Sequence, residues 1–322
     1  MSHELLDLSI GEPHLIRDLF YSSYGDLFKN IKLSDKNWDY HNSLNYKPLL
    51  NFLQNKHKSN VVITNGAKQA LNACFYLLNK INKKNIFLRT PCWSLIPPLL
   101  NHHNLNLTAS KDYNSYLLMN PNNPDGHFLN KQQCLNLEQE LKDKNIPLIH
   151  DAVYNNYCYI PKTEELVNTG DMQVFSLSKM FGFSSLRVGY VVVKDLEYFK
   201  ILNNYMELST SGVSHVSQDI ALKLLIYNNN SASRFSDNCF YGLRYNRKML
   251  STVLNDILEI PDNFIDQYGM FAWLKPGKHF DAGRLNVKIC DGEQFGEPGK
   301  IRINLAQSHD VIKEFVERLK RG

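Results

Sequence analysis

The most restrictive feature of this sequence is a recurring unit in which a short apolar run ends at a Gly, Pro or Asn break and a helical stretch follows. Strands that are buried on both faces of a parallel sheet read as continuous apolar runs, and helices connect them. Ligands bind at the carboxyl ends of the strands in such sheets. The pattern predicts an α/β fold with a mostly parallel central sheet between helices. The runs lie at residues 61–63, 86–88, 116–119, 147–149, 174–177 and 188–193.

The later part of the chain changes character. Residues 195–227 read as mostly helical, residues 268–274 and 301–305 read as separate strands, and residues 310–321 form an amphipathic helical pattern. We therefore predict a large domain over residues 41–205. A smaller α+β domain would combine residues 206–322 with residues 1–40.

Composition excludes several classes of function. The formal net charge of +4 is spread along 322 residues, which argues against a nucleic-acid partner. No run of about 18 apolar residues is present, so we expect no membrane span. The six cysteines lack the paired spacing of a zinc site and predict reduced thiols. The N-terminus has no basic segment before an apolar one, and we expect a cytoplasmic protein.

A lysine stands just after the run 174–177, with serines before it and glycines after it. Alone, such a lysine is ordinarily a surface residue at the end of a strand. A lysine that is desolvated near other cations has a lowered pKa and acts as a nucleophilic amine. Arg187 follows eight residues later, within reach of the same turn, and an arginine fork suits a phosphate. Residues 176–189 therefore indicate a site for a phosphorylated ligand.

The pattern Ser-x-Ser-Lys-x-x-Gly-x-x-x-x-Arg-x-Gly in this segment resembles the lysine segment of class I/II aminotransferases, which use pyridoxal 5′-phosphate (PLP). The resemblance implies the fold type I PLP-transferase fold. It also implies a Schiff base between Lys179 and PLP, with Ser176 and Arg187 on the cofactor phosphate.

Two further clusters fit the same family. Residues 120–126 (Asn-Pro-Asn-Asn-Pro-Asp-Gly) are similar to the family's Asn-Pro-x-Asn-Pro-x-Gly loop, which implies that Asn123 contacts the cofactor's phenolic oxygen and the substrate. Asp125 stands where relatives commonly have Thr. Asp151 follows the run 147–149, and its ordinary structural interpretation is a helix N-cap. The resemblance implies instead that Asp151 faces the pyridine nitrogen and that Tyr154 binds the phenolic oxygen.

The segment 64–71 reads as a glycine turn that opens a helix, where free backbone N–H groups attract an anion. In register with the family, Gly66, Ala67 and Lys68 would contact the phosphate, although many relatives have a small hydroxyl residue at the last of these positions. Trp93 falls where the family stacks an aromatic ring on the pyridine. The alternative interpretation of Trp93 is ordinary packing in the core.

Three residues complete the resemblance. Arg302 lies on the strand 301–305 and would bind the substrate α-carboxylate through a bidentate fork. Gly11, in a Gly-Glu-Pro sequence, would approach the same carboxylate. Tyr40 would reach the phosphate of a neighbouring subunit, but the glycine that usually follows it in relatives is missing.

The resemblance implies an aminotransferase that moves an amino group from an L-amino acid to a 2-oxo acid, working as a homodimer with shared active sites. Lys179 would be the general base, supported by Asp151 and Tyr154. Details around residues 121–126 and 209–214 are most similar to the alliinase and plant tryptophan-aminotransferase branch. A carbon–sulfur β-lyase and a non-catalytic PLP-binding relative remain the alternatives. The sequence names neither the amino donor nor the acceptor.

Overall fold

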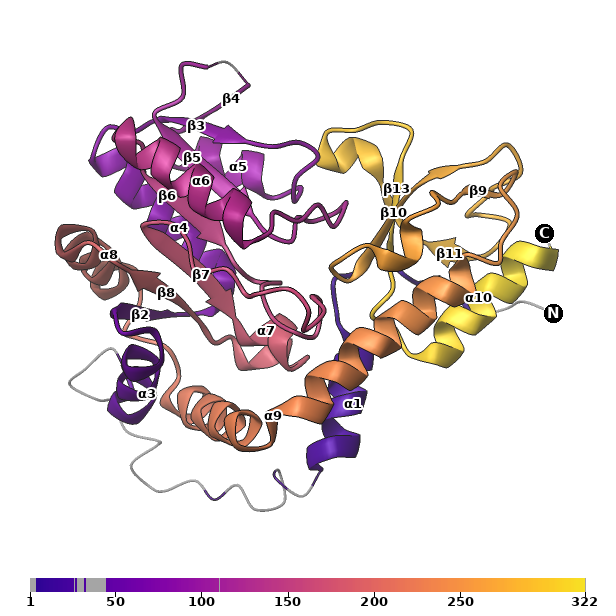
Figure 1. The fold of residues 1–322 in the computed structure, drawn as a ribbon, viewed down its shortest axis with the longest axis horizontal. Helices are drawn as coiled ribbons and strands as arrows, with labels where there is room; N and C mark the ends of the chain where they lie inside the picture. The colour runs from indigo at the N-terminus through magenta and orange to yellow at the C-terminus, as the bar shows by residue number, and fades with distance from the viewer. Residues whose placement is uncertain (1–3, 26, 28–31, 33–44, 110, 322) are drawn as a thin grey trace.

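The computed structural model describes residues 4–25, 27, 32, 45–109 and 111–321. Its largest element is a seven-stranded sheet in the order β2-β8-β7-β6-β5-β3-β4 (Figure 1). Only β8 runs against its neighbours, so the prediction of a mostly parallel sheet is confirmed. The strands are β2 (Asn60–Thr64), β3 (Asn85–Leu88), β4 (Asn106–Thr108), β5 (Ser115–Met119), β6 (Leu148–Asp151), β7 (Met172–Ser176) and β8 (Gly189–Val193).

Helices cover both faces of this sheet. Side chains alternate along β5, so that Leu117 and Met119 pack in the core beneath α4 (Gly66–Lys80) and α8 (Leu196–Ser209). Leu118 points to the other face and packs with Leu141 of α6 (Lys131–Asp143). α6 begins with a capping box in which Asn130 and Gln133 satisfy each other's backbone N–H groups. The shorter helix α5 (Ile96–His102) joins the α4 layer.

A second group of elements follows the large sheet. The helix α9 (His215–Leu250) leads to a four-stranded sheet in the order β12-β13-β10-β9, and α10 (His309–Arg321) packs along α9 (Figure 1). The N-terminal segment joins this group through α1 (His14–Tyr24), which packs against α9, and through β1 (Leu6–Asp7), which pairs with β11 (Val287–Lys288). α3 (Lys47–His57) packs between α9 and β2. The strands of the small sheet are β9 (Leu258–Glu259), β10 (Phe271–Pro276), β12 (Cys290–Asp291) and β13 (Ile301–Asn304).

The division into two domains, with the N-terminal segment grouped with the later part of the chain, stays a prediction. The helical stretch expected at residues 195–227 differs in detail. α8 ends at Ser209, residues 210–214 form a link around Gly212 with φ of 107°, and α9 extends to Leu250. Within the part of the chain that the structure describes, no helix combines the length and the apolar character needed to cross a membrane, α9 included.

The register of the sheet brings the sequence clusters to one edge. Ser176 at the end of β7 pairs with Gly189 at the start of β8, and Gly189 pairs with Thr64 at the end of β2. β5 and β6 run parallel to β7, so Met119 and Asp151 end at the same edge. The loops that follow these strands therefore open together beside the small sheet.

Candidate functional site

A pocket of about 530 Å³ lies at this edge, between the large sheet and the small one. Its volume is within the range of small-molecule sites. Eleven of the thirteen residues expected at the site line it: Gly11, Ala67, Lys68, Trp93, Asn123, Asp151, Tyr154, Ser176, Lys179, Arg187 and Arg302. Gly66 lies behind this lining, in contact range of Arg187. Tyr40 is outside the described residues, so its expected role stays a prediction.

Lys179 sits on the single-turn helix α7 (Leu177–Met180), directly after β7. The Ser176 hydroxyl caps this turn by accepting from the Ser178 N–H at 3.2 Å, and the Tyr159 hydroxyl donates to the Lys179 carbonyl at 2.7 Å. The Lys179 Nζ donates to the Gly11 carbonyl. Burial lowers the pKa of Lys179 to about 8, and the charges of Arg302 and Arg187 act in the same direction while Glu12 opposes them. The amine is therefore desolvated and partly neutral near physiological pH.

Asp151 is the last residue of β6, and its Oδ1 accepts from the Val153 N–H at 3.2 Å. No helix begins here, because turns lead from β6 to β7, so the helix N-cap interpretation is wrong. Burial raises the pKa of Asp151 to about 6. Tyr154 also lines the pocket, with its ring packed edge-on against Tyr159 at 5.2 Å. Burial raises the pKa of Tyr154, which keeps its hydroxyl protonated as a hydrogen-bond donor.

The start of α4 forms an anion cradle with Arg187. No side chain caps this helix, and Ala67 and Lys68 of its first turn line the pocket. Uncapped N–H groups at a helix N-terminus attract anions. The Arg187 guanidinium crosses this turn and donates to the Asn65 carbonyl at 3.2 Å and to the Ser184 carbonyl at 2.9 Å. Gly66 has φ of +74°, and a Cβ there would lie 2.4 Å from Arg187 Nη2, so the crossing requires glycine.

Arg302 enters the pocket from β13 with only 6% of its surface exposed. Its guanidinium lies over the rings of Phe271 (4.2 Å) and Phe295 (4.7 Å). Nη1 donates to Asn123 Oδ1 at 3.2 Å, and Nη2 donates to the Ser9 carbonyl at 2.7 Å. Among the described residues no carboxylate forms an ion pair with Arg302, and its Nε is buried without a partner. A buried cation in this state is costly until an anion binds it.

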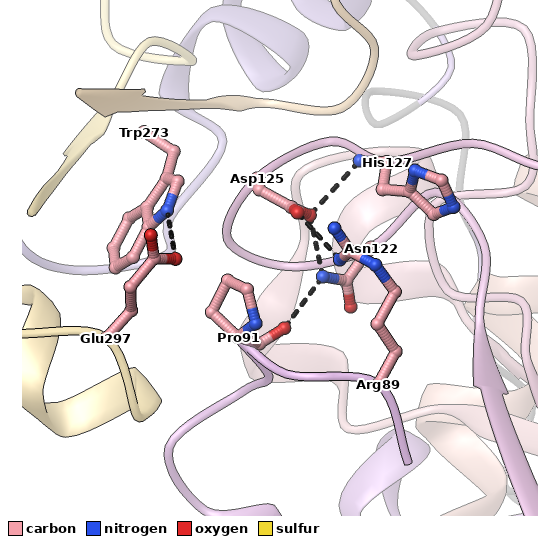
Figure 2. A network of polar contacts seen from close by, with 7 residues as sticks. All are labelled: Arg89, Pro91, Asn122, Asp125, His127, Trp273 and Glu297. Atoms are coloured by element: carbon pink, nitrogen blue, oxygen red, sulfur yellow. Dashed lines mark hydrogen bonds and ion pairs between the residues drawn. The ribbon is translucent and has the colours of Figure 1, made fainter.

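The loop that carries Asn123 is fixed by its neighbours (Figure 2). Asn122 donates to the Pro91 carbonyl at 2.9 Å and to Asp125 Oδ1 at 2.7 Å, while the His127 N–H donates to the same carboxylate at 3.1 Å. Arg89 pairs with Asp125 at 2.7 Å. Asp125, which stands where relatives commonly have Thr, thus supplies a carboxylate that closes the turn. Figure 2 also shows a separate pair, in which Trp273 of β10 donates to Glu297 at 3.1 Å.

Sequence reasoning missed eight of the nineteen residues that line the pocket, among them Ser184, Phe271 and Glu12. The Ser184 hydroxyl donates to Glu12 Oε2 at 2.8 Å, which ties the segment before α1 to the side of the pocket where Arg187 lies. Phe271 packs on Arg302. Glu12 lies beside Gly11 in the Gly-Glu-Pro sequence, which was the one available signal. Ser184 lies at an unspecified position of the lysine segment and Phe271 lies in a predicted strand, so neither had a signal of its own, because their importance comes from the residue they contact. Of the remaining expected residues, Trp93 is half-buried and Lys68 is exposed at the rim.

Comparisons with known proteins point to one family. A model of the family described as aminotransferase class I and II matches residues 106–319. Tryptophan aminotransferase-related protein 1 of Oryza sativa subsp. japonica is 26% identical over 304 residues, which cover 80% of this chain and 66% of the relative. Tryptophan aminotransferase-related protein 2 of Arabidopsis thaliana is 29% identical over 296 residues, which cover 80% and 65%. The chain thus spans about two thirds of the length of these plant relatives.

Two solved structures show the same fold at greater length. An aspartate aminotransferase double mutant of Thermus thermophilus has a TM-score of 0.76 at 18% identity and covers 99% of this chain and 91% of its own. The tyrosine aminotransferase of Leishmania infantum has a TM-score of 0.77 at 16% identity with the same coverage. At these identities the likeness concerns the fold.

Proposed function

The chain belongs to the aminotransferase class I and II family, and from that premise we propose that it is a PLP-dependent enzyme that transfers an amino group from an L-amino acid to a 2-oxo acid. One observation carries the proposal. The desolvated Lys179 amine shares a pocket with the half-buried Asp151 carboxylate and with the Arg302 guanidinium, which forms no ion pair with a carboxylate among the described residues. This combination suits a substrate that carries both an amino group and a carboxylate.

The residues present fit PLP. The anion cradle formed by Gly66, Ala67 and Arg187 suits the cofactor phosphate, and Lys68 at the rim adds positive charge. Lys179 would hold the cofactor aldehyde covalently. The raised pKa of Asp151 reflects burial without a counter-charge, and a protonated ring nitrogen would supply that charge. Asn123 and Tyr154 would bind the phenolic oxygen, and Trp93 would cover one face of the ring. When bound, PLP supplies the electron sink for a carbanion at Cα.

The protein side chains then have distinct tasks. Arg302 would hold the substrate α-carboxylate with its planar fork, oriented by the two phenylalanine rings. With its amine free, the Lys179 Nζ would accept the proton from the substrate Cα. It would then donate this proton to the cofactor carbon. A base with a pKa of about 8 is well matched to this task near neutral pH. Leu71, Met119 and Phe271 form the apolar parts of the pocket wall.

Absorption spectra of the purified protein test the proposal, with wild type compared with Lys179→Ala. We expect wild type to show a cofactor band that borohydride reduces, and the variant to lack this response. Single amino acids that convert the band to the amine form of the cofactor would identify the donor. Release of ammonia and pyruvate from a cysteine conjugate, with no acceptor present, would identify a β-lyase instead. Absence of PLP binding in the presence of excess cofactor would refute the proposal.

We also propose that the chain assembles as a homodimer, as its family resemblance implies. Light scattering on the purified protein measures the mass directly. A monomer with full activity would contradict the shared active site expected for Tyr40.

A further inference from the structure

Residues 9–12 (Ser-Ile-Gly-Glu), called here the 9–12 segment, contact the site through three of their four residues. The Ser9 carbonyl accepts from Arg302, and the Gly11 carbonyl accepts from Lys179. The Glu12 carboxylate accepts from Ser184. The segment therefore contacts the residue proposed for the substrate carboxylate and the residue proposed for the proton transfer.

Asn304 holds the backbone of this segment. It lies two residues after Arg302 on β13, so both side chains emerge from the same face of the small sheet. The Asn304 side chain is fully buried, and its Nδ2 donates to the Ile10 carbonyl at 2.9 Å and to the Glu12 carbonyl at 2.8 Å. Its Oδ1 accepts from the Ala306 N–H at 2.8 Å. Both amide hydrogens are thus used on the two carbonyls that flank Gly11.

This geometry fixes where the Gly11 carbonyl points. With the carbonyls of Ile10 and Glu12 both turned to Asn304, the carbonyl between them is directed to Lys179. Gly11 itself approaches the site closely, since a Cβ there would lie 3.5 Å from Lys179 Nζ and 3.8 Å from the Phe271 ring. A displaced segment would therefore disturb the Arg302 guanidinium and the Gly11 backbone together.

We propose that Asn304 is a positioning residue, which sets the affinity for the amino-acid carboxylate by fixing the 9–12 segment against Arg302 and Lys179. The inference rests on the proposed function, because it assigns the substrate carboxylate to Arg302. Asn304 does not itself line the pocket, and its side chain makes no hydrogen bond to Gly66, Ala67 or Arg187 of the anion cradle. Its removal would therefore leave the affinity for PLP unchanged.

The chain offers a matched control. Asn246 on α9 is also fully buried, and its Nδ2 also donates to two backbone carbonyls, those of Leu305 (2.8 Å) and Gln307 (3.0 Å). None of its contacts involves the 9–12 segment. Asn304→Ala and Asn246→Ala should therefore lower Tm by similar amounts. A difference in substrate binding between the two variants then reports on the position of the 9–12 segment rather than on the stability of the protein.

Steady-state kinetics on the PLP-loaded enzyme provide the first test. We expect Asn304→Ala to raise KM for the amino donor about tenfold, the effect of weakening one charge-assisted contact, with kcat changed far less. Asn246→Ala should leave KM unchanged. If an alanine variant does not fold, Asn304→Ser and Asn246→Ser retain one donor and preserve the comparison. Equal KM values in the paired variants would overturn the proposal.

A second measurement does not depend on the cofactor. In the PLP-free protein, mass spectrometry follows the acylation of Lys179 over time. Loss of the Gly11 acceptor should destabilise the charged amine, so Asn304→Ala should accelerate acylation at pH values below the pKa of Lys179, while Asn246→Ala should not. Identical acylation rates in both variants would contradict the role of Asn304. Failure of wild type to bind PLP would instead refute the proposed function, and the two failures are distinguishable.

Discussion

Replacing Gly66 by alanine should separate backbone strain from loss of the anion cradle. Gly66 opens α4 with φ of +74°, and its missing Cβ makes room for the Arg187 guanidinium. An alanine Cβ would lie 2.4 Å from Arg187 Nη2, closer than Cβ contacts come in proteins, and 3.0 Å from its Cζ. The guanidinium must move and lose its bonds to the carbonyls of Asn65 and Ser184.

The Gly66→Ala substitution is expected to have two effects, one on the folding free energy and one on the affinity for PLP. A left-handed alanine costs about 1 kcal/mol in folding free energy relative to glycine. Displacing Arg187 removes charge-assisted hydrogen bonds to the phosphate, and each such bond contributes about 1.5–3 kcal/mol. If one bond is lost, Kd for PLP should rise about 10- to 100-fold. The affinity loss is therefore expected to exceed what backbone strain alone produces.

Gly299→Ala is the matched control. Gly299 has φ of +82°, yet a Cβ there would have no atom within 4 Å. The control therefore carries a similar backbone cost without a collision. PLP affinity would be measured by absorbance titration of cofactor-free protein, and stability by urea unfolding. We expect Gly299→Ala to bind PLP as wild type does. If Gly66→Ala also binds PLP with wild-type affinity, the assignment of Arg187 to the phosphate is wrong.

Three further outcomes follow from the same geometry. In cofactor-free protein, Lys179 should be half-neutral at about pH 8, so mass spectrometry should find it acylated at that pH while exposed lysines react slowly. Arg302→Lys should raise KM for amino donors more than about tenfold and leave Kd for PLP unchanged, because an ammonium cannot reproduce the planar fork; an unchanged KM would refute its role. Burial lowers the pKa of His150 to about 4, below its unfolded value of about 6.5. Between these two pH values the unfolded state binds more protons than the folded state, so the folding stability falls as the pH falls. Urea unfolding at about pH 7.5 and about pH 5 should show a loss that His150→Leu reduces by about 2 kcal/mol, and an equal loss in both proteins would exclude this cause.

The sequence alone determined most of the large sheet and the order of its clusters. Apolar runs mark buried strands because backbone polar groups pair within the sheet and only apolar side chains suit its two covered faces. The exception is β4, whose sequence Asn-Leu-Thr is partly exposed at the edge of the sheet and gave no apolar run. Local spacing also linked Ser176, Lys179 and Arg187, since all three lie between the last residue of β7 and the start of β8.

Only the tertiary structure decided how distant residues meet. Asn123 and Arg302 are 179 positions apart, and Gly11 and Lys179 are 168 positions apart, yet each pair is in hydrogen-bond contact. The reversed direction of β8 likewise depends on its pairing with β2 and β7 rather than on its own residues. Phe271 and Asn304 carry no motif of their own, and the Gly-Glu-Pro sequence gave no role for Glu12, because the contribution of all three lies in contacts that form only in the folded chain. Sequence specifies such residues through packing and hydrogen-bond satisfaction across the whole chain, and these become visible only when the chain is folded.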